Sequence, residues 1–399
     1  MSLLLEPWIL KTLGFAILVG SIIALIEKSG GIYGFVHFVQ NQKSLVTSPR
    51  SALLLSYVVG IVIFVESSIT SLIAGAVGKP LCDHYKIPHA KLALVCDSTS
   101  APVSSLIVLN GWGALLLGLI STQITEGMIQ GDSIDILIDA VLYNFYAMSA
   151  LGVTFLFIWF NIDIGPMKHS TYNPFLHDKQ TVRQANKYYM ILPIVLMVLM
   201  VFVFLYITGD GNILKGSGSS SIFYTMVSTM VFMFFYFVGT KNMRVMTWTS
   251  VAFKGALKFI PIALILLFAF SIGKVTTDLK TGLYLASLAS DNLNVHFLAG
   301  AIFLLSSVIS FATGTSWGTF SIMIPVAVPM AVGLDANIAL AIGAVISGGV
   351  FGDHCSPISD TTIISSMASD CDVIEHVNTQ LPYALISGLI ALFFFIAFS

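Results

Sequence analysis

Charged residues are scarce in this 399-residue chain. Asp, Glu, Lys and Arg make up 10% of the sequence, hydrophobic residues make up 56%, and the mean hydropathy is +0.92. Soluble domains carry about 25% charged residues, and disordered chains are rich in polar and charged residues, so the composition excludes both classes. A helix crosses the bilayer with about 20 apolar residues, which leaves room for about ten crossings. The composition predicts an all-α polytopic membrane protein.

Three further features are missing from the sequence. No basic stripe stands out among the scattered Lys and Arg residues, so no nucleic-acid partner is expected. The cysteines form no CxxC pair and match no metal motif, and we expect them to be small buried hydrophobic residues. They are Cys82, Cys96, Cys355 and Cys371. The N-terminus lacks a cationic region and a small-residue cleavage site, which predicts a retained first helix rather than a signal peptide.

Ten apolar stretches divide into two kinds. Six fit complete membrane helices: 8–25, 134–160, 188–207, 222–239, 253–273 and 381–398. Four others are interrupted by Gly, Pro, hydroxyl or carboxylate residues: 51–79, 92–119, 297–332 and 338–369. A free backbone group in hydrocarbon is costly unless protein, ion or water satisfies it. We therefore expect re-entrant hairpins at 51–79 and 297–332, and discontinuous transmembrane helices at 92–119 and 338–369.

The distribution of basic residues predicts an orientation. Lys and Arg gather in four linkers: 28–50, 79–91, 168–187 and 241–258. The positive-inside rule places these linkers in the cytoplasm and the Glu126 linker, which has no Lys or Arg, outside. Arg50 and Lys79 share one side only if the stretch between them enters and leaves by the same face, which puts Glu66 near its tip. The next interrupted stretch then crosses the membrane once.

Short patterns recur in the same order in the two ends of the chain. Residues 64–70 (FVESSIT) parallel residues 311–317 (FATGTSW), and residues 97–102 (DSTSAP) parallel residues 353–357 (DHCSP). With the predicted orientation, residues 1–132 and 251–399 form inverted repeats joined by connecting helices at 133–250. Inverted repeats with discontinuous helices are a recurring design of secondary transporters that work by alternating access.

Carboxylates lie inside otherwise apolar segments, where an ionisable side chain is costly and marks a candidate functional site. They are Asp97, Asp353, Asp360 and Glu66. Competition between H⁺ and Na⁺ for one carboxylate gives obligatory exchange. Na⁺ prefers oxygen ligands, and neighbouring hydroxyls supply them: Ser98, Thr99, Ser100, Thr313, Thr315, Ser316, Ser356 and Thr361. We predict a cation and proton site with Na⁺ at Asp353 and Asp97, and no cofactor beyond the transported ions.

Simpler structural roles compete with these assignments. Each carboxylate can instead cap a helix or form an Asx turn at the break. His354 either relays protons and orients Asp353 or is an ordinary hydrogen-bonded histidine, and the other seven histidines are expected mostly in linkers. Trp317 lies inside a polar break, where it is predicted to form a wall of the site.

Two blocks of the sequence resemble the NhaC family of Na⁺/H⁺ antiporters, in the ion transporter superfamily. They are residues 311–319 (FATGTSWGT) with Ile324-Pro325, and residues 352–362 (GDHCSPISDTT). The resemblance covers most of the chain, from about residue 18, and implies a cation/proton exchanger of inverted-repeat fold in the cell membrane. Longer members of this family carry additional N-terminal hydrophobic sequence, whereas this chain begins almost at the first repeat.

The expected function is therefore secondary active transport, with H⁺ exchanged for Na⁺ or Li⁺. Because the family also contains exchangers of organic acids and transporters of amino acids, a Na⁺/H⁺-coupled exchanger of this kind is the alternative. An intramembrane aspartyl protease would need a dyad such as Asp97 and Asp353, but its Tyr-Asp and Gly-x-Gly-Asp signatures are missing here. A passive ion channel is a further alternative. The expected partners are Na⁺, H⁺, the lipid bilayer and a second copy in a homodimer.

Overall fold

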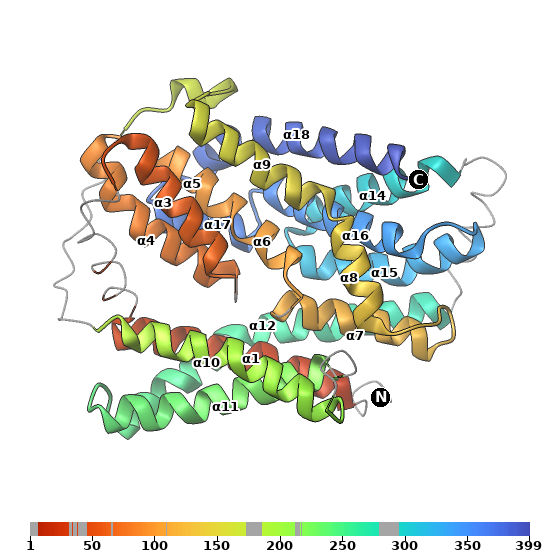
Figure 1. Ribbon diagram of the computed structural model, residues 1–399, viewed down its shortest axis with the longest axis horizontal. Coiled ribbons are helices and arrows are strands. Elements are labelled where there is room, and N and C mark those ends of the chain that lie inside the picture. Colours follow the sequence, from red (N-terminus) through yellow and green to blue (C-terminus); the bar gives the residue numbers. More distant parts are fainter. Residues whose placement is uncertain are drawn as a thin grey trace. The chain divides into compact units, whose positions relative to one another are not determined.

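A computed structural model of the protein describes residues 7–31, 34, 38, 46–64, 67–108, 110–172, 186–211, 216, 218–278 and 295–399. All regular secondary structure within these ranges is helical, so the all-α prediction is confirmed (Figure 1). Six helices in the described ranges are long and apolar enough to cross a membrane. A seventh span results if the bent pair His89–Leu106 and Gly111–Thr125 is counted as one.

The chain divides into two compact units. The first unit comprises residues 1–43, 109–118 and 176–268, and the second comprises residues 44–108, 119–175 and 269–399. The predicted inverted repeats divide the chain differently, at residues 132 and 250, and they stay a prediction.

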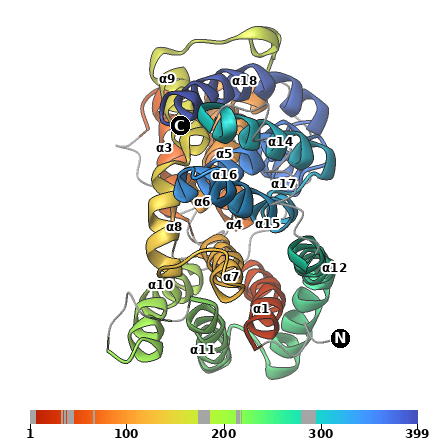
Figure 2. The same cartoon turned by 90° about the vertical axis from the view of Figure 1, so that its right-hand side faces the viewer.

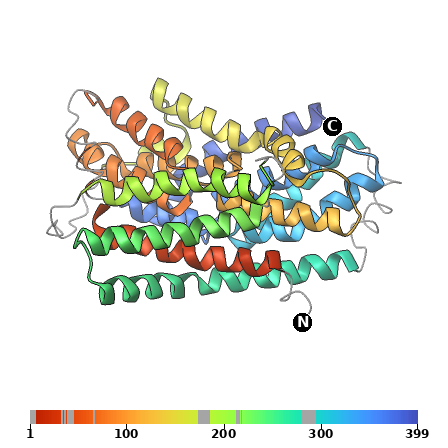
Figure 3. The same cartoon turned by 60° about the horizontal axis from the view of Figure 1, so that its bottom comes forward.

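Long apolar helices form the first unit. They are α1 (Pro7–Ser29), α10 (Tyr188–Thr208), α11 (Gly218–Gly239) and the first part of α12 (Val245–Asp278). Figure 3 shows α11 beside both α1 and α10. Polar side chains bind across the packed surfaces, as the Ser21 hydroxyl does when it donates to the Ala252 carbonyl at 2.9 Å. These helices cover four of the six stretches that the sequence predicts to be complete helices, and α10 is the one among them that, within the described residues, is long and apolar enough to cross a membrane.

Each of the four stretches predicted to be interrupted is divided into separate helices. On the N-terminal side, the helices are α3 (Pro49–Val62), α4 (Ser67–Tyr85), α5 (His89–Ser98), α6 (Ala101–Leu106) and α7 (Gly111–Thr125), the last of which also reaches into the first unit. On the C-terminal side, they are α14 (Leu298–Thr313), α15 (Ser316–Gly333), α16 (Ile338–Cys355) and α17 (Asp360–Ser369). Gly314 ends α14 with a φ of +67°, a left-handed conformation suited to glycine. The re-entrant course of these segments stays a prediction.

The prediction of one complete helix over 134–160 is wrong. The segment forms α8 (Ser133–Leu142) and α9 (Phe145–Phe160), which are separated at Tyr143 and Asn144. The Asn144 side chain caps α9 by accepting from the Ala147 N–H, and it also donates to the Ser105 hydroxyl at 2.8 Å. The cap satisfies a backbone N–H at the start of α9, which only a new helix start leaves without a partner. The Asn144 side chain therefore stabilises the break.

The last helix begins two turns earlier than the predicted 381–398. This helix, α18 (Val373–Ala397), starts after Asp372, whose side chain accepts hydrogen bonds from the N–H groups of Ile374 and Glu375. The cap satisfies two N–H groups that would otherwise lack partners. The additional turns bring His376 and Gln380 into the helix.

Helix α16 lies at the centre of the second unit, in contact with α14, α15 and α18 (Figure 2). Its glycines allow close approach of α14, because a Cβ atom on Gly352 would overlap the Ser307 carbonyl oxygen. Since nearly all of α16 is buried, its C-terminal residues Asp353 and His354 lie in the interior of the unit.

Candidate functional site

Asp97 lies in the last turn of α5 and is fully buried. The helix ends here because the following hydroxyls bind backbone carbonyls. Thr99 Oγ1 donates to the Val95 carbonyl at 2.8 Å, and Ser100 Oγ donates to the Asp97 carbonyl at 2.9 Å. These side chains therefore shape the break, and the Asp97 carboxylate is left facing the helices that pack against it.

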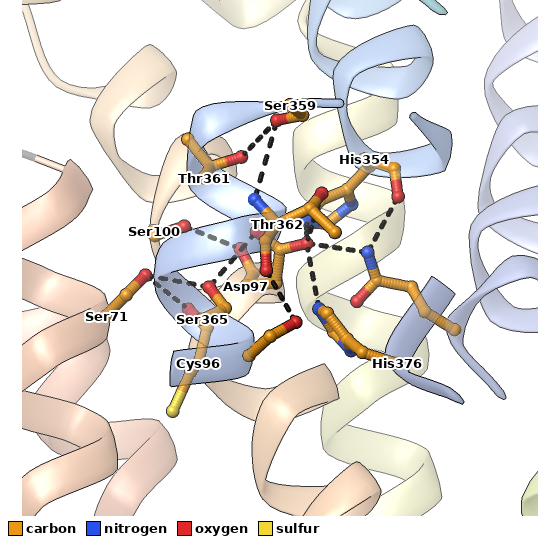
Figure 4. Close-up of polar contacts among 12 residues, drawn as sticks. Ser71, Cys96, Asp97, Ser100, His354, Ser359, Thr361, Thr362, Ser365 and His376 are labelled. Carbon is orange, nitrogen blue, oxygen red and sulfur yellow. Dashed lines mark hydrogen bonds and ion pairs between the residues drawn. The ribbon is translucent and has the colours of Figure 1, made fainter. Parts of the chain in front are cut away.

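Side chains from α17 and α18 surround the Asp97 carboxylate (Figure 4). Gln380 Nε2 donates to Oδ2 at 2.7 Å, and Thr362 Oγ1 donates to the same oxygen at 3.4 Å. Ser365 Oγ donates to Oδ1 at 3.3 Å and also lies 3.0 Å from Ser71 Oγ on α4. A buried carboxylate loses its hydration. Charge-assisted hydrogen bonds of this kind compensate for part of that loss.

Two buried imidazoles complete the surroundings of Asp97. His376 Nε2 lies 3.4 Å from Oδ2, and His354 Nε2 lies 3.7 Å from the same oxygen. The Tyr146 hydroxyl lies 2.9 Å from His354 Nδ1. If Tyr146 donates this hydrogen bond, the proton of a neutral His354 ring is on Nε2, facing Asp97. The carboxylate and the imidazoles together form a group able to hold and exchange protons.

Asp353 lies next to this group and has a different environment. Thr361 Oγ1 donates to its Oδ2 at 3.2 Å, whereas Oδ1 is buried and has no hydrogen-bond partner in the described residues. The side chains of Ser316 and Ser359 lie beside this carboxylate. A buried carboxylate with a free oxygen and neighbouring hydroxyls offers the hard oxygen ligands that Na⁺ prefers. The adjacent Thr361 and Thr362 thus contact the two aspartates from the first turn of α17.

The remaining predicted residues occupy several kinds of position. Asp360 is exposed at the start of α17, where its Oδ1 accepts from the Thr361 N–H. Ser316 and Ser356 donate to the carbonyls of Gly349 and Phe311. Other predicted residues are placed as follows: Ser98 is buried, Thr315 caps α15, Thr313 is exposed, and Trp317 is half-buried in the first turn of α15. Glu66 lies outside the described residues.

Several residues of the site were missed in the sequence analysis. They are Ser71, Tyr146, Ser365, His376 and Gln380. For the two on α18 a signal was present. Asp372 followed by Glu375 is a pattern typical of a helix start, and a spacing of four residues places His376 and Gln380 on one helical face.

Comparison with known proteins places this chain among antiporters. A family model described as the Na⁺/H⁺ antiporter family matches residues 110–399. An uncharacterized protein of Haemophilus influenzae is 32% identical over 392 residues, which cover 93% of this chain and 75% of that protein. The Malate-2H(+)/Na(+)-lactate antiporter of Bacillus subtilis is 40% identical over 92 residues, which cover 22% of this chain and 20% of that antiporter.

The fold is similar to that of a solved transporter. The crystal structure of the Alcanivorax borkumensis YdaH transporter, described as having an unusual topology, aligns with a TM-score of 0.54 and 14% sequence identity. The alignment covers 99% of this chain and 88% of the YdaH chain. At this identity the similarity concerns the fold alone, and it agrees with the helical membrane architecture described above.

Proposed function

Because the chain belongs to the Na⁺/H⁺ antiporter family, we propose that it exchanges H⁺ for Na⁺ across the cell membrane at Asp97 and Asp353. The protein is an integral membrane transporter rather than an enzyme, which removes the protease alternative. The observation that carries the proposal is the fully buried Asp97 carboxylate, held by Gln380 and facing the imidazole of His376. An ionisable side chain inside a membrane protein costs free energy, so such a residue usually has a function. Binding of the transported proton would be that function here.

The two aspartates are proposed to have different tasks. The Gln380 amide donates to Asp97 Oδ2, and two imidazole nitrogens lie close to the same oxygen. A cation at this oxygen would have to compete with these groups for its lone pairs. Protons suit this environment better than Na⁺. Asp353 has the free Oδ1 and hydroxyl neighbours, so we assign Na⁺ to Asp353 and the proton to the Asp97 group.

The first turn of α17 offers a route for coupling between the two sites. Thr361 contacts Asp353 and the adjacent Thr362 contacts Asp97. A shift of this turn on Na⁺ binding would change both hydrogen bonds together. Binding of one ion would thereby alter the affinity for the other, which is the requirement for exchange by alternating access.

Exchange of an organic acid is the second candidate. It is supported by the similarity to the malate and lactate antiporter of Bacillus subtilis. An organic carboxylate needs a cationic partner, and within the described residues the ion pairs of Asp97 involve histidines but no Lys or Arg. A protonated imidazole would supply that charge, although the oxygen-rich surroundings of Asp353 favour Na⁺.

Purified protein in liposomes that contain a pH-sensitive dye tests the proposal. Na⁺, Li⁺, K⁺, malate, lactate and amino acids are added one at a time outside the vesicles. We expect saturable proton flux with Na⁺ or Li⁺. Flux that ignores both cations but responds to malate, lactate or an amino acid would replace Na⁺/H⁺ exchange with the second candidate. Vesicles without protein are the control for leakage.

A further inference from the structure

A small cavity with several polar side chains in its lining adjoins the Asp97 group in the second unit. Its lining comes from α5, α9, α16 and α18, and it has room for about one water molecule. Polar side chains contribute much of the lining: Ser98, Tyr146, Thr154, His354, Gln380 and Ser387. Apolar cavities of this size stay dry, whereas a cavity with several polar partners holds an ordered water.

Gln380 provides an independent indication that this cavity is occupied. Its Nε2 donates to Asp97 Oδ2 and to the His354 carbonyl, both at 2.7 Å. Because both partners are acceptors, the amide cannot be flipped without losing two hydrogen bonds. Its Oε1 is then buried with no partner in the described residues. A buried acceptor left unsatisfied is costly, and a water molecule in the adjoining cavity would satisfy it.

The cavity also connects the Asp97 group to an exposed segment. Tyr383 lines the cavity, and its hydroxyl accepts from the Ile164 N–H at 2.8 Å and donates to the Ile162 carbonyl at 3.4 Å. Ile162 is exposed just beyond the end of α9. The predicted cytoplasmic linker 168–187 follows this segment in the chain. Tyr383 therefore contacts both the cavity and the segment that follows α9.

We propose that this cavity binds a water molecule through Gln380 Oε1 and forms the path by which protons travel between the Asp97 group and the end of α9. The inference rests on the proposed Na⁺/H⁺ exchange. Na⁺ needs no part of this path, because the free Asp353 oxygen and the hydroxyls of Ser316 and Ser359 lie outside the cavity lining. Loss of the water should slow proton movement and leave Na⁺ movement intact.

Two substitutions remove the water in different ways. Ala150→Val adds methyl groups to the cavity lining, and Thr154→Val replaces a lining hydroxyl with a methyl group of similar size. Gly152→Ala on the same helix is the matched control, because its new methyl group would meet nothing within 4 Å. Each variant is reconstituted, and both Na⁺-driven proton flux and the exchange of radioactive Na⁺ for unlabelled Na⁺ are measured.

We expect Ala150→Val and Thr154→Val to lower Na⁺-driven proton flux about tenfold, while Na⁺/Na⁺ exchange and the control Gly152→Ala stay at wild-type rates. Unchanged proton flux in both folded variants would overturn the water path, as would an equal loss of both exchange modes. Failure of the proposed function is distinguishable, because wild-type protein would then show no Na⁺-driven proton flux. Should Ala150→Val fail to fold, Thr154→Val alone decides the question.

Discussion

The side-chain amide of Gln380 donates a hydrogen bond of 2.7 Å to the Asp97 carboxylate and joins α18 to α5. The second amide N–H reaches the His354 carbonyl at the end of α16. Three helices that are distant in sequence are thus tied together at one nitrogen atom. Since both contacts are fully buried, the amide fixes the position of the proposed proton site.

Replacement of this amide should weaken both the fold and the exchange. Gln380→Met keeps a similar length and removes both N–H donors, leaving the buried carboxylate without its shortest hydrogen bond. We expect a loss of about 1.5–3 kcal/mol in stability and a large loss of Na⁺-driven proton flux. Thermal unfolding in detergent and dye-loaded liposomes measure the two effects. Wild-type stability in the variant would show that the amide contributes little.

His376 should influence how exchange depends on pH. In wild-type protein, competition between H⁺ and Na⁺ raises the apparent KM for Na⁺ by up to about tenfold for each unit of acidification. His376→Gln removes a titratable ring at 3.4 Å from Asp97 Oδ2. We expect KM to depend less steeply on pH in this variant, because the group around Asp97 then lacks one imidazole.

The exposed His169 provides the control for this substitution. His169→Gln should leave the KM profile unchanged, since this residue lies in the short helix η2 (Gly165–His169) beyond α9. An identical profile for wild-type, His376→Gln and His169→Gln proteins would remove His376 from the proton site.

Asn144 should be required for the break between α8 and α9. Asn144→Leu favours a continuous helix and leaves the Ser105 and Ser347 hydroxyls without their amide partner. We expect a loss of about 1–3 kcal/mol in stability, measured by thermal unfolding. The exposed Met148 lies one turn further along α9, and Met148→Leu is the control that should retain wild-type stability.

The sequence predicts a site residue when the feature that marks the residue lies in its own stretch of sequence. Asp97 and Asp353 were identified because carboxylates inside apolar runs are unusual, whatever surrounds them. Gln380 and His376 were missed because they lie near the start of a helix that was predicted to begin later. Their partner Asp97 is 283 residues from Gln380, and such a contact depends on tertiary packing rather than on local pattern.

The same distinction explains the hydroxyl residues and the helix breaks. The sequence correctly marks polar interruptions, but it does not say whether a hydroxyl there faces an ion or a backbone carbonyl. Thr99 and Ser100 bind carbonyls of their own helix end, whereas Thr361 contacts Asp353. Asn144 is one of several polar residues in the stretch 134–160, and its role depends on Ser105 and Ser347 from other helices.

Cysteine labelling from either side of the membrane tests the predicted orientation. Single cysteines replace the exposed Lys86 and Gln130. We expect the first to label from the cytoplasmic side and the second from outside, because the stretch between them crosses once. Burial, helped by nearby carboxylates, raises the pKa of the native Cys371 thiol to about 12, so its background labelling is slow. Labelling of both positions from one side would contradict the inverted repeat.

The most direct test of ion exchange at buried carboxylates is Na⁺-driven proton flux in Asp353→Asn, with Asp335→Asn in the exposed turn after α15 as the matched control. Asn keeps the shape of the side chain and can still accept the Thr361 hydrogen bond, but it cannot bind Na⁺ as a carboxylate does. We predict that Asp353→Asn remains folded and monodisperse, loses coupled flux to the level of empty liposomes, and is no longer stabilised by Na⁺ against heating. Asp335→Asn should retain the flux of the wild-type protein, since Asp335 is exposed and lies outside the site. Robust Na⁺-driven flux in well-folded Asp353→Asn would contradict the account.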